Sequence, residues 1–448
     1  MDAHLGNIFF LTRFRLSLAV FVGMLMLFTS LVTLDKVAPG AARATVGVLT
    51  PGASLLTKFL PLFFVPSLVV LPLQPAPGLA DAAKLAFLTV AGWATSVVIS
   101  GYTLSVLAKI ASSFKAADTS SSVPKKPAFV HVKVPTSVKP PPFSSSLQCA
   151  LAVATLITGA AAAVLARIGS SAAGAGGSGG IVNVASQALL HCGVSAHGCE
   201  AAFALCTTAF AFVSGSLFPQ NVRKVVHPVL FTAFATVISL QCFAALAGLA
   251  DPLGPLTRYL THAMSASAVG GGDLLLFCLG PAVVTFGLEM YARRKVMAAQ
   301  WFEVCGSSVT MAVVGLFGTA ALARGLGMAE NLRLATTMRQ ITSPLALSCA
   351  NTLGTDGSIA VALVVVTGLL GANFGGTFMT ALGVKSPVAR GLTMGATAHG
   401  LGTASMATDE PKAFAFSAIA MALVGTATAT FVAMPPVRVA LRAAAGVP

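Results

Sequence analysis

The sequence predicts an all-α protein, a polytopic transmembrane helical bundle. Of its 448 residues, 56% are hydrophobic and only 9% are charged, and the mean hydropathy is +0.87. Soluble domains carry roughly 25% charged residues. A soluble fold of this length would need a larger polar shell to cover so much apolar surface, whereas lipid tolerates it.

Two uncharged stretches near the N-terminus have the length of a membrane span. There are 19 uncharged residues between Arg15 and Asp35, and 24 between Lys84 and Lys109. A helix of about 20 residues crosses the hydrocarbon core of a bilayer, so each stretch predicts one span.

An apolar stretch that is rich in proline lies between these two spans. Leu60–Leu79 contains five prolines. Proline interrupts a helix, and in lipid the freed carbonyl groups need protein partners. We therefore expect one bent or re-entrant segment here, with Val46–Leu56 as a further short segment.

The composition changes over residues 112–146, which contain six prolines, five lysines and many serines. Such a segment builds no core, so we expect a flexible basic linker between a membrane module over 1–111 and a larger one over 147–448. The lysines place the linker on the positive side of the membrane, stroma or cytoplasm. Because Arg13 and Arg15 compete for that side, the orientation of the first module stays open.

The larger module is predicted to contain seven spans and two shorter apolar segments that are rich in small and hydroxyl residues. The spans are Leu147–Ala166, Ala201–Phe218, Val225–Ala250, Asp273–Tyr291, Val304–Ala323, Ser358–Leu382 and Ala413–Val437, and the short segments are Gln340–Thr355 and Gly391–Thr408. The whole chain thus predicts about 11 to 13 segments. We expect an internal repeat that pairs Leu147–Tyr291 with Val304–Thr408, although no residue-level repeat is evident.

Interrupted helices are a common way for carriers to build a site near the bilayer midplane, because the exposed helix N-termini attract anions. Two segments carry such interruptions: Gly280 and Pro281 within Asp273–Glu289, and Gly400 and Gly402 around His399 within Arg390–Asp409. We therefore expect a substrate site at these interruptions. Asp273 and Glu289 are expected to be interfacial, with a coupling role as the alternative.

His399 is the titratable residue of the second interruption. It is followed by Gly400, Gly402 and Thr403, and the glycines allow the backbone to unwind and approach a ligand. A histidine at membrane depth is costly, so it is a candidate for donating to a carboxylate or for carrying a coupling proton. The alternative is a tightly packed histidine that bonds a backbone carbonyl.

Arg339 precedes a predicted helix N-terminus. Pro344 suits the first turn of a helix, with Thr342 or Ser343 as the cap. Such an N-terminus attracts anions and Arg339 would add a cation, whereas the alternative is an interfacial loop arginine.

Three polar residues at span depth, Thr367, Asn351 and Asn373, are candidates for lining a cavity or for bonding neighbouring helices. Gly371-xxx-Gly375 and Gly391-xxx-Gly395 predict close helix contacts.

Other functional classes find little support. The net charge is +14, but the basic residues are scattered between apolar blocks, so no nucleic-acid partner is expected. His191, Cys192, His197 and Cys199 lie within nine residues without zinc-finger spacing, so neither a metal nor a cofactor is expected. The sequence has no HExxH helix and no nucleophile elbow in a credible setting, so we do not expect an enzyme.

Several motifs carry a resemblance to a known family: Thr367–Phe374, Ala389–Gly391, Ala398–Ala404, Glu410–Pro411, Phe416–Ala420, Leu279–Val284 and His227–Leu230. Together they resemble the Lrg/Cid membrane-protein family, above all its plastid branch, and Ala398–Ala404 is the most specific match. Leu60–Pro66 resembles the separate A-type partner that bacteria encode beside the B-type protein. The resemblance therefore implies a fused chain, with an A-type module over 1–111 and a B-type transport module over 147–448.

The resemblance implies a transporter that exchanges two small organic anions, glycolate and glycerate, across the chloroplast inner envelope in photorespiration. Bacterial relatives have a lysine in a Lys-Ser-Val-Thr-x-Pro motif where this chain has Arg339–Pro344, so the positive charge is shifted and becomes arginine. Proton coupling and homo-oligomerisation are left open.

Two other functions remain as alternatives. A holin-like or regulatory protein would oligomerise and permeabilise the membrane, but it needs no interrupted helices. A sodium/proton antiporter would keep carboxylates in mid-span, and this sequence has almost none there.

The first residues, Met1–Phe14, lack the Ser/Arg-rich, acid-poor stretch of a transit peptide, and no secretory signal peptide stands out. This leaves two alternatives, a leader removed before this numbering or an incomplete chain.

Overall fold

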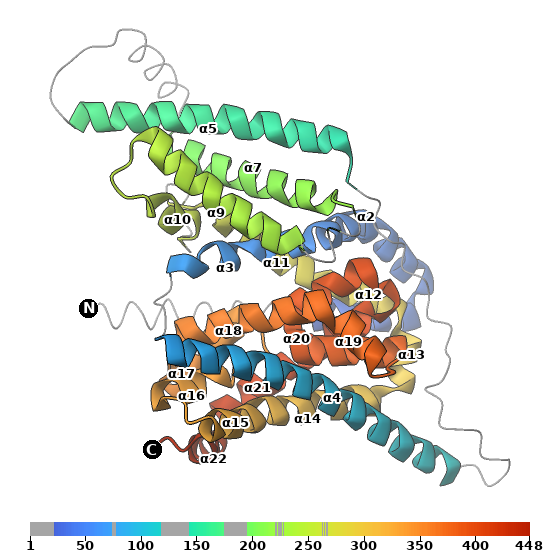
Figure 1. Ribbon diagram of the computed structural model, residues 1–448. Helices are drawn as coiled ribbons and strands as arrows, with labels where there is room; N and C mark the ends of the chain where they lie inside the picture. Colours follow the sequence, from blue (N-terminus) through green and yellow to red (C-terminus); the bar gives the residue numbers. More distant parts are fainter. Residues whose placement is uncertain are drawn as a thin grey trace. The chain divides into compact units, whose positions relative to one another are not determined.

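The computed structural model is built from helices, as the sequence predicts (Figure 1). It describes residues 22–73, 78–117, 143–173, 195–219, 222, 226, 228–261, 263, 265 and 268–448. Within these ranges, nine helices are long and apolar enough to cross a membrane. The polytopic helical bundle is thereby confirmed.

The helices of the first half follow a helix over residues 22–37. They are α2 (Pro39–Phe63), α3 (Val65–Val69), α4 (Leu79–Ala117), α5 (Ser145–Ala173), α7 (Ala196–Ser216), α9 (Pro228–Ala247) and α10 (Gly254–Tyr259), with a 3₁₀ turn at Leu71–Leu73.

The second half contains shorter pieces as well as long helices. They are α11 (Gly271–Val284), α12 (Phe286–Ala292), α13 (Arg294–Ala299), α14 (Trp301–Val313), the π-helical turn η2 (Val314–Gly318), α15 (Thr319–Gly325), α16 (Glu330–Thr336), α17 (Ser343–Leu353), α18 (Gly357–Leu370), the π-helical turn η3 (Gly371–Gly375), α19 (Gly376–Ala381), α20 (Pro387–Asp409), α21 (Pro411–Ala433) and α22 (Pro435–Ala445).

Two compact units make up the chain, and each draws on separate stretches of sequence. Unit 1 contains residues 1–58, 76–140 and 280–448, and unit 2 contains 59–75 and 141–279. The predicted division into two modules and a linker follows chain order and stays a prediction. The linker lies mostly outside the described residues.

Unit 2 is a small helical bundle in which α5, α7 and α9 pack side by side (Figure 1). Glycine allows close packing here, because a Cβ on Gly159 would lie 2.9 Å from the Phe203 ring. α3 packs on α9, and α10 packs on α7 and α9. The proline-rich stretch is broken as predicted, because α2 ends at Phe63 and a short α3 follows.

The described helix 22–37 and α4 both belong to unit 1, together with the C-terminal half of the chain. The first helix packs on α12 through Leu31, Leu288 and Tyr291, and Asp35 forms an ion pair with Arg294 at 2.7 Å. α4 packs against α14, α18 and α20. Part of the predicted N-terminal module therefore contributes to the core of the larger one.

α20 is a re-entrant hairpin. Arg390 in its first turn forms an ion pair with Glu410, the residue that follows its last turn, although a straight helix would separate residues 20 apart by about 30 Å. The backbone reverses at His399, whose φ of 39° and ψ of −135° are not helical. The predicted interruption is thus confirmed, with the break at the histidine itself.

α16 and α17 form a second hairpin. Thr355 Oγ1, just after α17, donates to the carbonyl oxygen of Asn331 at the start of α16, 24 residues earlier. Residues 337–342 connect the two helices and include Arg339. The open end of this hairpin is therefore at Asn331 and Thr355, and its tip is at Arg339.

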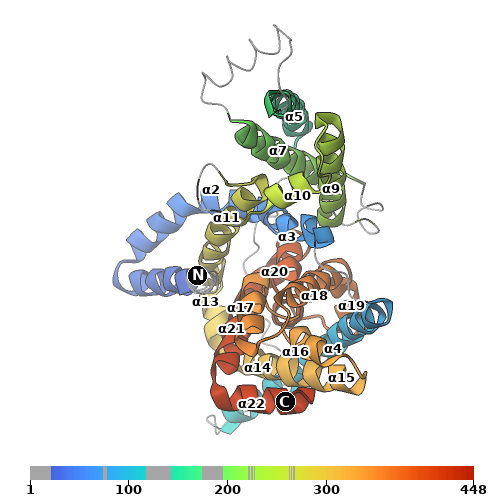
Figure 2. The ribbon, with the colours of Figure 1, turned by 90° about the vertical axis from the view of Figure 1, so that its left-hand side faces the viewer.

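The two hairpins enter unit 1 from opposite faces. α18, η3 and α19 form one 25-residue segment, about 37 Å long, that starts beside Thr355 and ends beside Arg390, which bonds Thr380. The face with Asn331, Thr355 and α22 is called here the C-terminal face. The other face, where Arg390 meets Glu410 and Arg293 bonds the Pro411 carbonyl oxygen, is called the Pro411 face. Figure 2 looks onto the C-terminal face, where α15, α16 and α22 lie together.

These elements form an inverted repeat. In each copy a span contains a π-helical turn that ends in Phe-Gly, at Gly318 and at Gly375, and a left-handed glycine and a hairpin follow. The left-handed glycines are Gly327 and Gly383, with φ of 58° and 74°. The spans run in opposite directions between the two faces. This repeat, over 301–353 and 357–409, is shorter than the expected one and lies almost wholly within its second member.

The predicted close contacts at the spaced glycines are confirmed. A Cβ on Gly391 would lie 2.2 Å from the carbonyl oxygen of Ala413 on α21, and one on Gly395 would lie 2.0 Å from that of Ser417. In η3, a Cβ on Gly371 would lie 2.0 Å from the Cβ of Ala398. The α20 hairpin is thus held between α21 and η3.

Candidate functional site

Arg339 lies at the tip of the α16–α17 hairpin, and its guanidinium is buried against α4. The residue is only 2% exposed. Its Nη2 donates to the carbonyl oxygen of Gly92 and to Ser96 Oγ, both at 2.8 Å. A Cβ on Gly92 would lie 3.1 to 3.2 Å from guanidinium atoms, so the absence of a side chain there permits the close approach.

The guanidinium retains donors without acceptors. In the described part of the chain, Arg339 Nε and Nη1 are buried without a hydrogen-bond partner, and no carboxylate pairs with them. A buried cation without a counter-charge is costly, and an anion would offset that cost. Arg339 therefore has the chemistry of an anion site.

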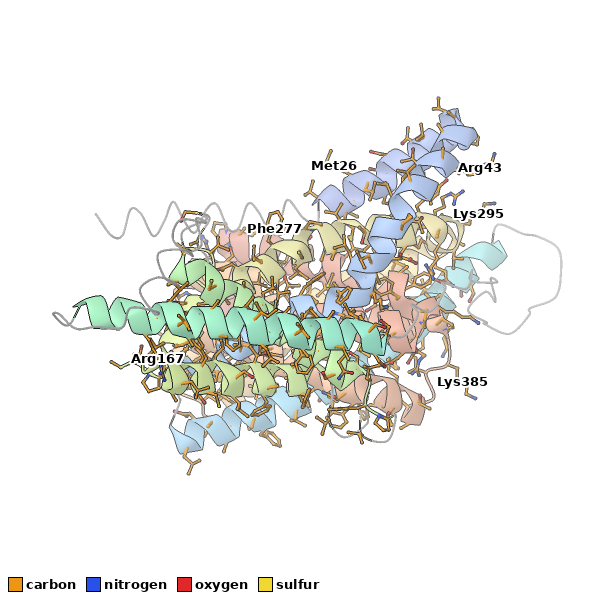
Figure 3. All side chains as sticks on the ribbon, turned by 90° about the horizontal axis from the view of Figure 1, so that it is seen from above. Met26, Arg43, Arg167, Phe277, Lys295 and Lys385 are labelled. Atoms are coloured by element: carbon orange, nitrogen blue, oxygen red, sulfur yellow. The ribbon has the colours of Figure 1, made fainter. Side chains whose placement is uncertain are left out.

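Three other basic residues of unit 1 have a different environment. Arg43, Lys295 and Lys385 are exposed, and all three side chains lie at the same end of the unit, the Pro411 face (Figure 3). Basic residues bordering apolar spans ordinarily lie at the interface in this way. The burial of Arg339 disfavours its alternative interpretation as an interfacial loop arginine.

Gln340 completes the tip. It is 3% exposed and packs on the π-helical turn η2, where a Cβ on Gly315 would lie 2.4 Å from its terminal amide group. With the amide oxygen toward Ser96 and Arg339, its nitrogen donates to the carbonyl oxygen of Met311 at 3.3 Å. Both the oxygen and the nitrogen of the Gln340 amide then have a partner, whereas Arg339 Nε and Nη1 have none among the described residues.

His399, at the tip of the α20 hairpin, is 2% exposed. Its Nε2 lies 2.7 Å from the carbonyl oxygen of Val364 on α18. A carbonyl only accepts, so Nε2 carries the proton and Nδ1 is an acceptor, which has no partner in the described part of the chain. The bond to a backbone carbonyl agrees with the packed-histidine alternative, while the free Nδ1 could accept from a hydroxyl or take up a proton.

The three predicted site residues that follow His399, namely Gly400, Gly402 and Thr403, are buried in the second leg of α20. Gly402 lies against the first leg, where a Cβ would be 2.6 Å from the Cβ of Ala398. Thr403 Oγ1 lies 2.8 Å from Ser417 Oγ on α21. Gly402 thus lets the two legs approach each other, and Thr403 fastens the second leg to α21.

Thr342 and Ser343 lie at the start of α17, where the helix N-terminus was predicted. Thr342 occupies the cap position with extended backbone, φ −74° and ψ 150°, but its side chain makes no capping bond. Asn351 is exposed near the other end of α17, away from the tip. Thr342 and Ser343 therefore lie at the end of α17 next to the hairpin tip that contains Arg339, whereas Asn351 lies near the opposite end of the helix.

Asn373 lies in η3 and borders a polar cleft of about 390 Å³ at the open end of the α20 hairpin. The cleft is lined by Ala372, Asn373, Gly376, Thr377, Thr380, Arg390, Met394, Ser405, Met406, Asp409 and Glu410. Asn373 Nδ2 donates to the carbonyl oxygen of Leu369 at 2.8 Å, so its Oδ1 is the atom available to the cleft.

The remaining candidates lie on other elements. Gly280 and Pro281 are in α11, which continues past the proline to Val284, and Pro281 is exposed. Asp273 accepts bonds from Thr261 and Gly270 in the preceding loop, and Glu289 pairs with Arg293.

Of the four residues considered for a metal, His191 and Cys192 lie outside the described residues. His197 Nε2 lies 3.0 Å from the carbonyl oxygen of Val269. The described residues contain no group of three or more His, Cys, Asp or Glu side chains placed to hold a metal.

Comparison with known proteins places the chain. The LrgB-like family model matches residues 208–436, about half of the chain. The plastidal glycolate/glycerate translocator 1, chloroplastic, of Arabidopsis thaliana is 32% identical over 454 aligned residues, covering 99% of this chain and 79% of that protein. The chain belongs to the LrgB-like family. No solved structure matches it.

Family membership and this relative support a membrane transporter. In this LrgB-like chain, the matched region contains both hairpins and both π-helical turns of unit 1. α4 lies outside the matched region, although its Gly92 and Ser96 accept the hydrogen bonds of Arg339.

A polar face of α4 that lies beside Arg339 was not singled out from the sequence. Thr89, Trp93, Ser96 and Ser100 follow helical spacing on one face of α4, and all four are buried. Ser100 Oγ bonds Thr393 Oγ1 of the α20 hairpin at 3.1 Å. A row of hydroxyl and indole groups in an uncharged span is the signal that could have marked this face.

We expect Gly368→Ala to lower uptake by this LrgB-like chain about tenfold or more. A Cβ at Gly368, on α18, would lie 2.6 Å from His399 Cε1 and 2.9 Å from Nε2, so the ring must leave Val364. Overpacking of this kind costs about 1–3 kcal/mol. Gly325→Ala is the matched control, because nothing lies within 4 Å of its added methyl group. Unchanged substrate uptake by Gly368→Ala in proteoliposomes would show that the position of the His399 ring does not matter.

Proposed function

We propose that this chain is a secondary transporter of small monocarboxylates that exchanges glycolate and glycerate across the chloroplast inner envelope, in photorespiration. The printed name of the Arabidopsis thaliana relative, a plastidal glycolate/glycerate translocator, supports the substrate pair. The inner envelope and photorespiration follow from the family resemblance. Arg339, buried at a re-entrant tip without a counter-charge, is the observation that carries the proposal.

The chemistry of the two tips suits a 2-hydroxy acid. Arg339 offers donors to a carboxylate, which only accepts. His399 Nδ1 offers an acceptor to a hydroxyl, or a site for a proton that moves with the substrate. Glycolate and glycerate contain both groups, so they would use both functions. Proton coupling is part of the proposal through His399.

The hairpins suit alternating access. Their tips enter from opposite faces, so a small movement of either one would open the site to one side of the membrane. Discontinuous helices in inverted repeats are a recurrent design of secondary transporters. A pore-forming protein has no need of such a buried, charged tip.

The test is counterflow in proteoliposomes that contain the full chain. Vesicles are preloaded with glycolate, glycerate, an unrelated sugar or buffer alone, and uptake of labelled glycolate is followed. We expect saturable uptake that either preloaded acid stimulates and that the sugar does not. A pH gradient that changes the rate would support proton coupling.

Two outcomes contradict the proposal. Unsaturable leakage of both acids and of the sugar would favour the holin-like alternative. A correctly inserted protein that moves neither acid would remove the glycolate/glycerate assignment.

A further inference from the structure

α4 is the unexpected partner of Arg339. It belongs to the N-terminal part of the chain, yet it supplies the two acceptors nearest to the guanidinium, the Gly92 carbonyl oxygen and Ser96 Oγ. These two bonds engage Nη2 alone and leave Nε and Nη1 without partners among the described residues. α4 therefore fixes the orientation of the guanidinium without neutralising its charge.

Trp93, which follows Gly92 on α4, adds a third unsatisfied donor to the two of Arg339. It is 5% exposed, and its Nε1 is buried without a hydrogen-bond partner in the described part of the chain. Buried indole N–H groups usually find a partner. The ring lies against η3, with its Cζ2 4.0 Å from the position of a Cβ on Gly375, and its centroid is 5.4 Å from that of the tilted Phe378 ring.

We propose that α4 forms one wall of the carboxylate site, with the Trp93 indole N–H as a direct ligand of the substrate carboxylate beside Arg339, and with Gly92 and Ser96 as positioning residues. The three free groups are all donors and two of them belong to a cation, which favours an anion that only accepts, as the carboxylate of the proposed substrates does. This inference rests on the proposed function and adds binding residues that lie outside the matched family region.

The two tryptophans of the chain, Trp93 and Trp301, make a direct test available. Trp301 is 64% exposed at the start of α14, so Trp301→Phe should leave uptake unchanged and leave Trp93 as the only tryptophan, which can be excited selectively over the tyrosines. In this variant we expect glycolate and glycerate to change the Trp93 emission saturably. The neutral isostere glycolamide should not, and Arg339→Gln should remove the response.

Transport by the same preparation separates the two claims. If Trp301→Phe exchanges glycolate while Trp93 emission stays insensitive to it, the α4 wall is wrong and the proposed function stands. If the protein neither transports nor responds, both fail.

Trp93→Phe tests the indole N–H itself, because it keeps an aromatic ring and removes the donor. A hydrogen bond to a charged group is strong enough that its loss should raise KM about tenfold or more, with kcat within about twofold. Trp301→Phe is the matched control. An unchanged KM in Trp93→Phe would exclude the indole as a ligand.

Ser96→Asp tests the α4 wall by adding a carboxylate to it, whereas Trp93→Phe removes a donor. A carboxylate tethered at Ser96 would lie beside Arg339 and take the place of the substrate, so uptake should fall at least about 100-fold while thermal stability stays equal or rises. Ser96→Asn adds nearly the same bulk without the charge, so its uptake should exceed that of Ser96→Asp by at least about tenfold, which separates the effect of charge from that of size. Normal uptake by Ser96→Asp would overturn the assignment.

Discussion

Arg339→Gln should reduce glycolate uptake by about 100-fold or more without lowering the thermal stability of the protein. Charge-assisted hydrogen bonds are worth about 1.5–3 kcal/mol each, and two donors of Arg339 are free for the substrate. The stability expectation has the opposite sign to the usual loss of a buried side chain. Removing an unpaired buried cation relieves a desolvation cost, and glutamine can still donate to Gly92 or Ser96.

The measurement combines uptake in proteoliposomes with thermal unfolding in detergent, with and without glycolate. We expect glycolate to stabilise the wild type and not the Arg339→Gln variant, since a ligand stabilises only the state that it binds. Arg339→Lys keeps the charge but not the planar set of donors, so it should retain partial uptake. Arg438→Gln on α22 is the control and should transport normally. Wild-type uptake by Arg339→Gln would remove Arg339 from the site.

The spans were accessible from the sequence because charge is so costly in lipid. The uncharged stretch between Lys84 and Lys109 became α4, and Ser358–Leu382 became the segment α18, η3 and α19. Glycine and proline breaks also carry local signals, so the interruption near His399 and the start of α17 beside Pro344 were predicted. Each of these features depends on residues that are neighbours in the sequence.

The hairpin topology depends on residues that are distant in the sequence. α20 has 23 residues, enough to cross a membrane, and it is the backbone reversal at His399 and the pairing of Arg390 with Glu410 that show it turning back. The hold of α4 on Arg339 joins residues more than 240 positions apart. The π-helical turns have no strong composition signal beyond small residues. These features produce no periodic pattern of residues, so a single sequence does not reveal them.

A charge exchange at Arg390 and Glu410 should show the hairpin directly. Glu410→Arg alone places two guanidinium groups at the open end of α20, and Arg390→Glu alone places two carboxylates there. Both side chains are mostly buried, 13% and 25% exposed, so each single variant should lose about 3–5 kcal/mol of stability and most of its uptake. The double variant should recover part of both.

Recovery should be incomplete for a reason that the structure supplies. Arg390 also donates to the carbonyl oxygens of Gly376 and Val384, and a glutamate at 390 cannot replace those bonds. The informative quantity is the coupling between the two changes, expected at about 1–3 kcal/mol. Pairing Glu410→Arg with Arg438→Glu on α22, at the C-terminal face, serves as the control and should be additive within about 0.5 kcal/mol.

The coupling decides between two topologies of the same sequence. In a continuous α20 that crosses the membrane, residues 390 and 410 would be about 30 Å apart, and their charge reversals would add independently. In the re-entrant hairpin they are in contact, and the second reversal must depend on the first. Additive losses in the double variant would therefore contradict the hairpin. They would indicate a continuous α20, with His399 in the middle of an ordinary span and not at a buried tip.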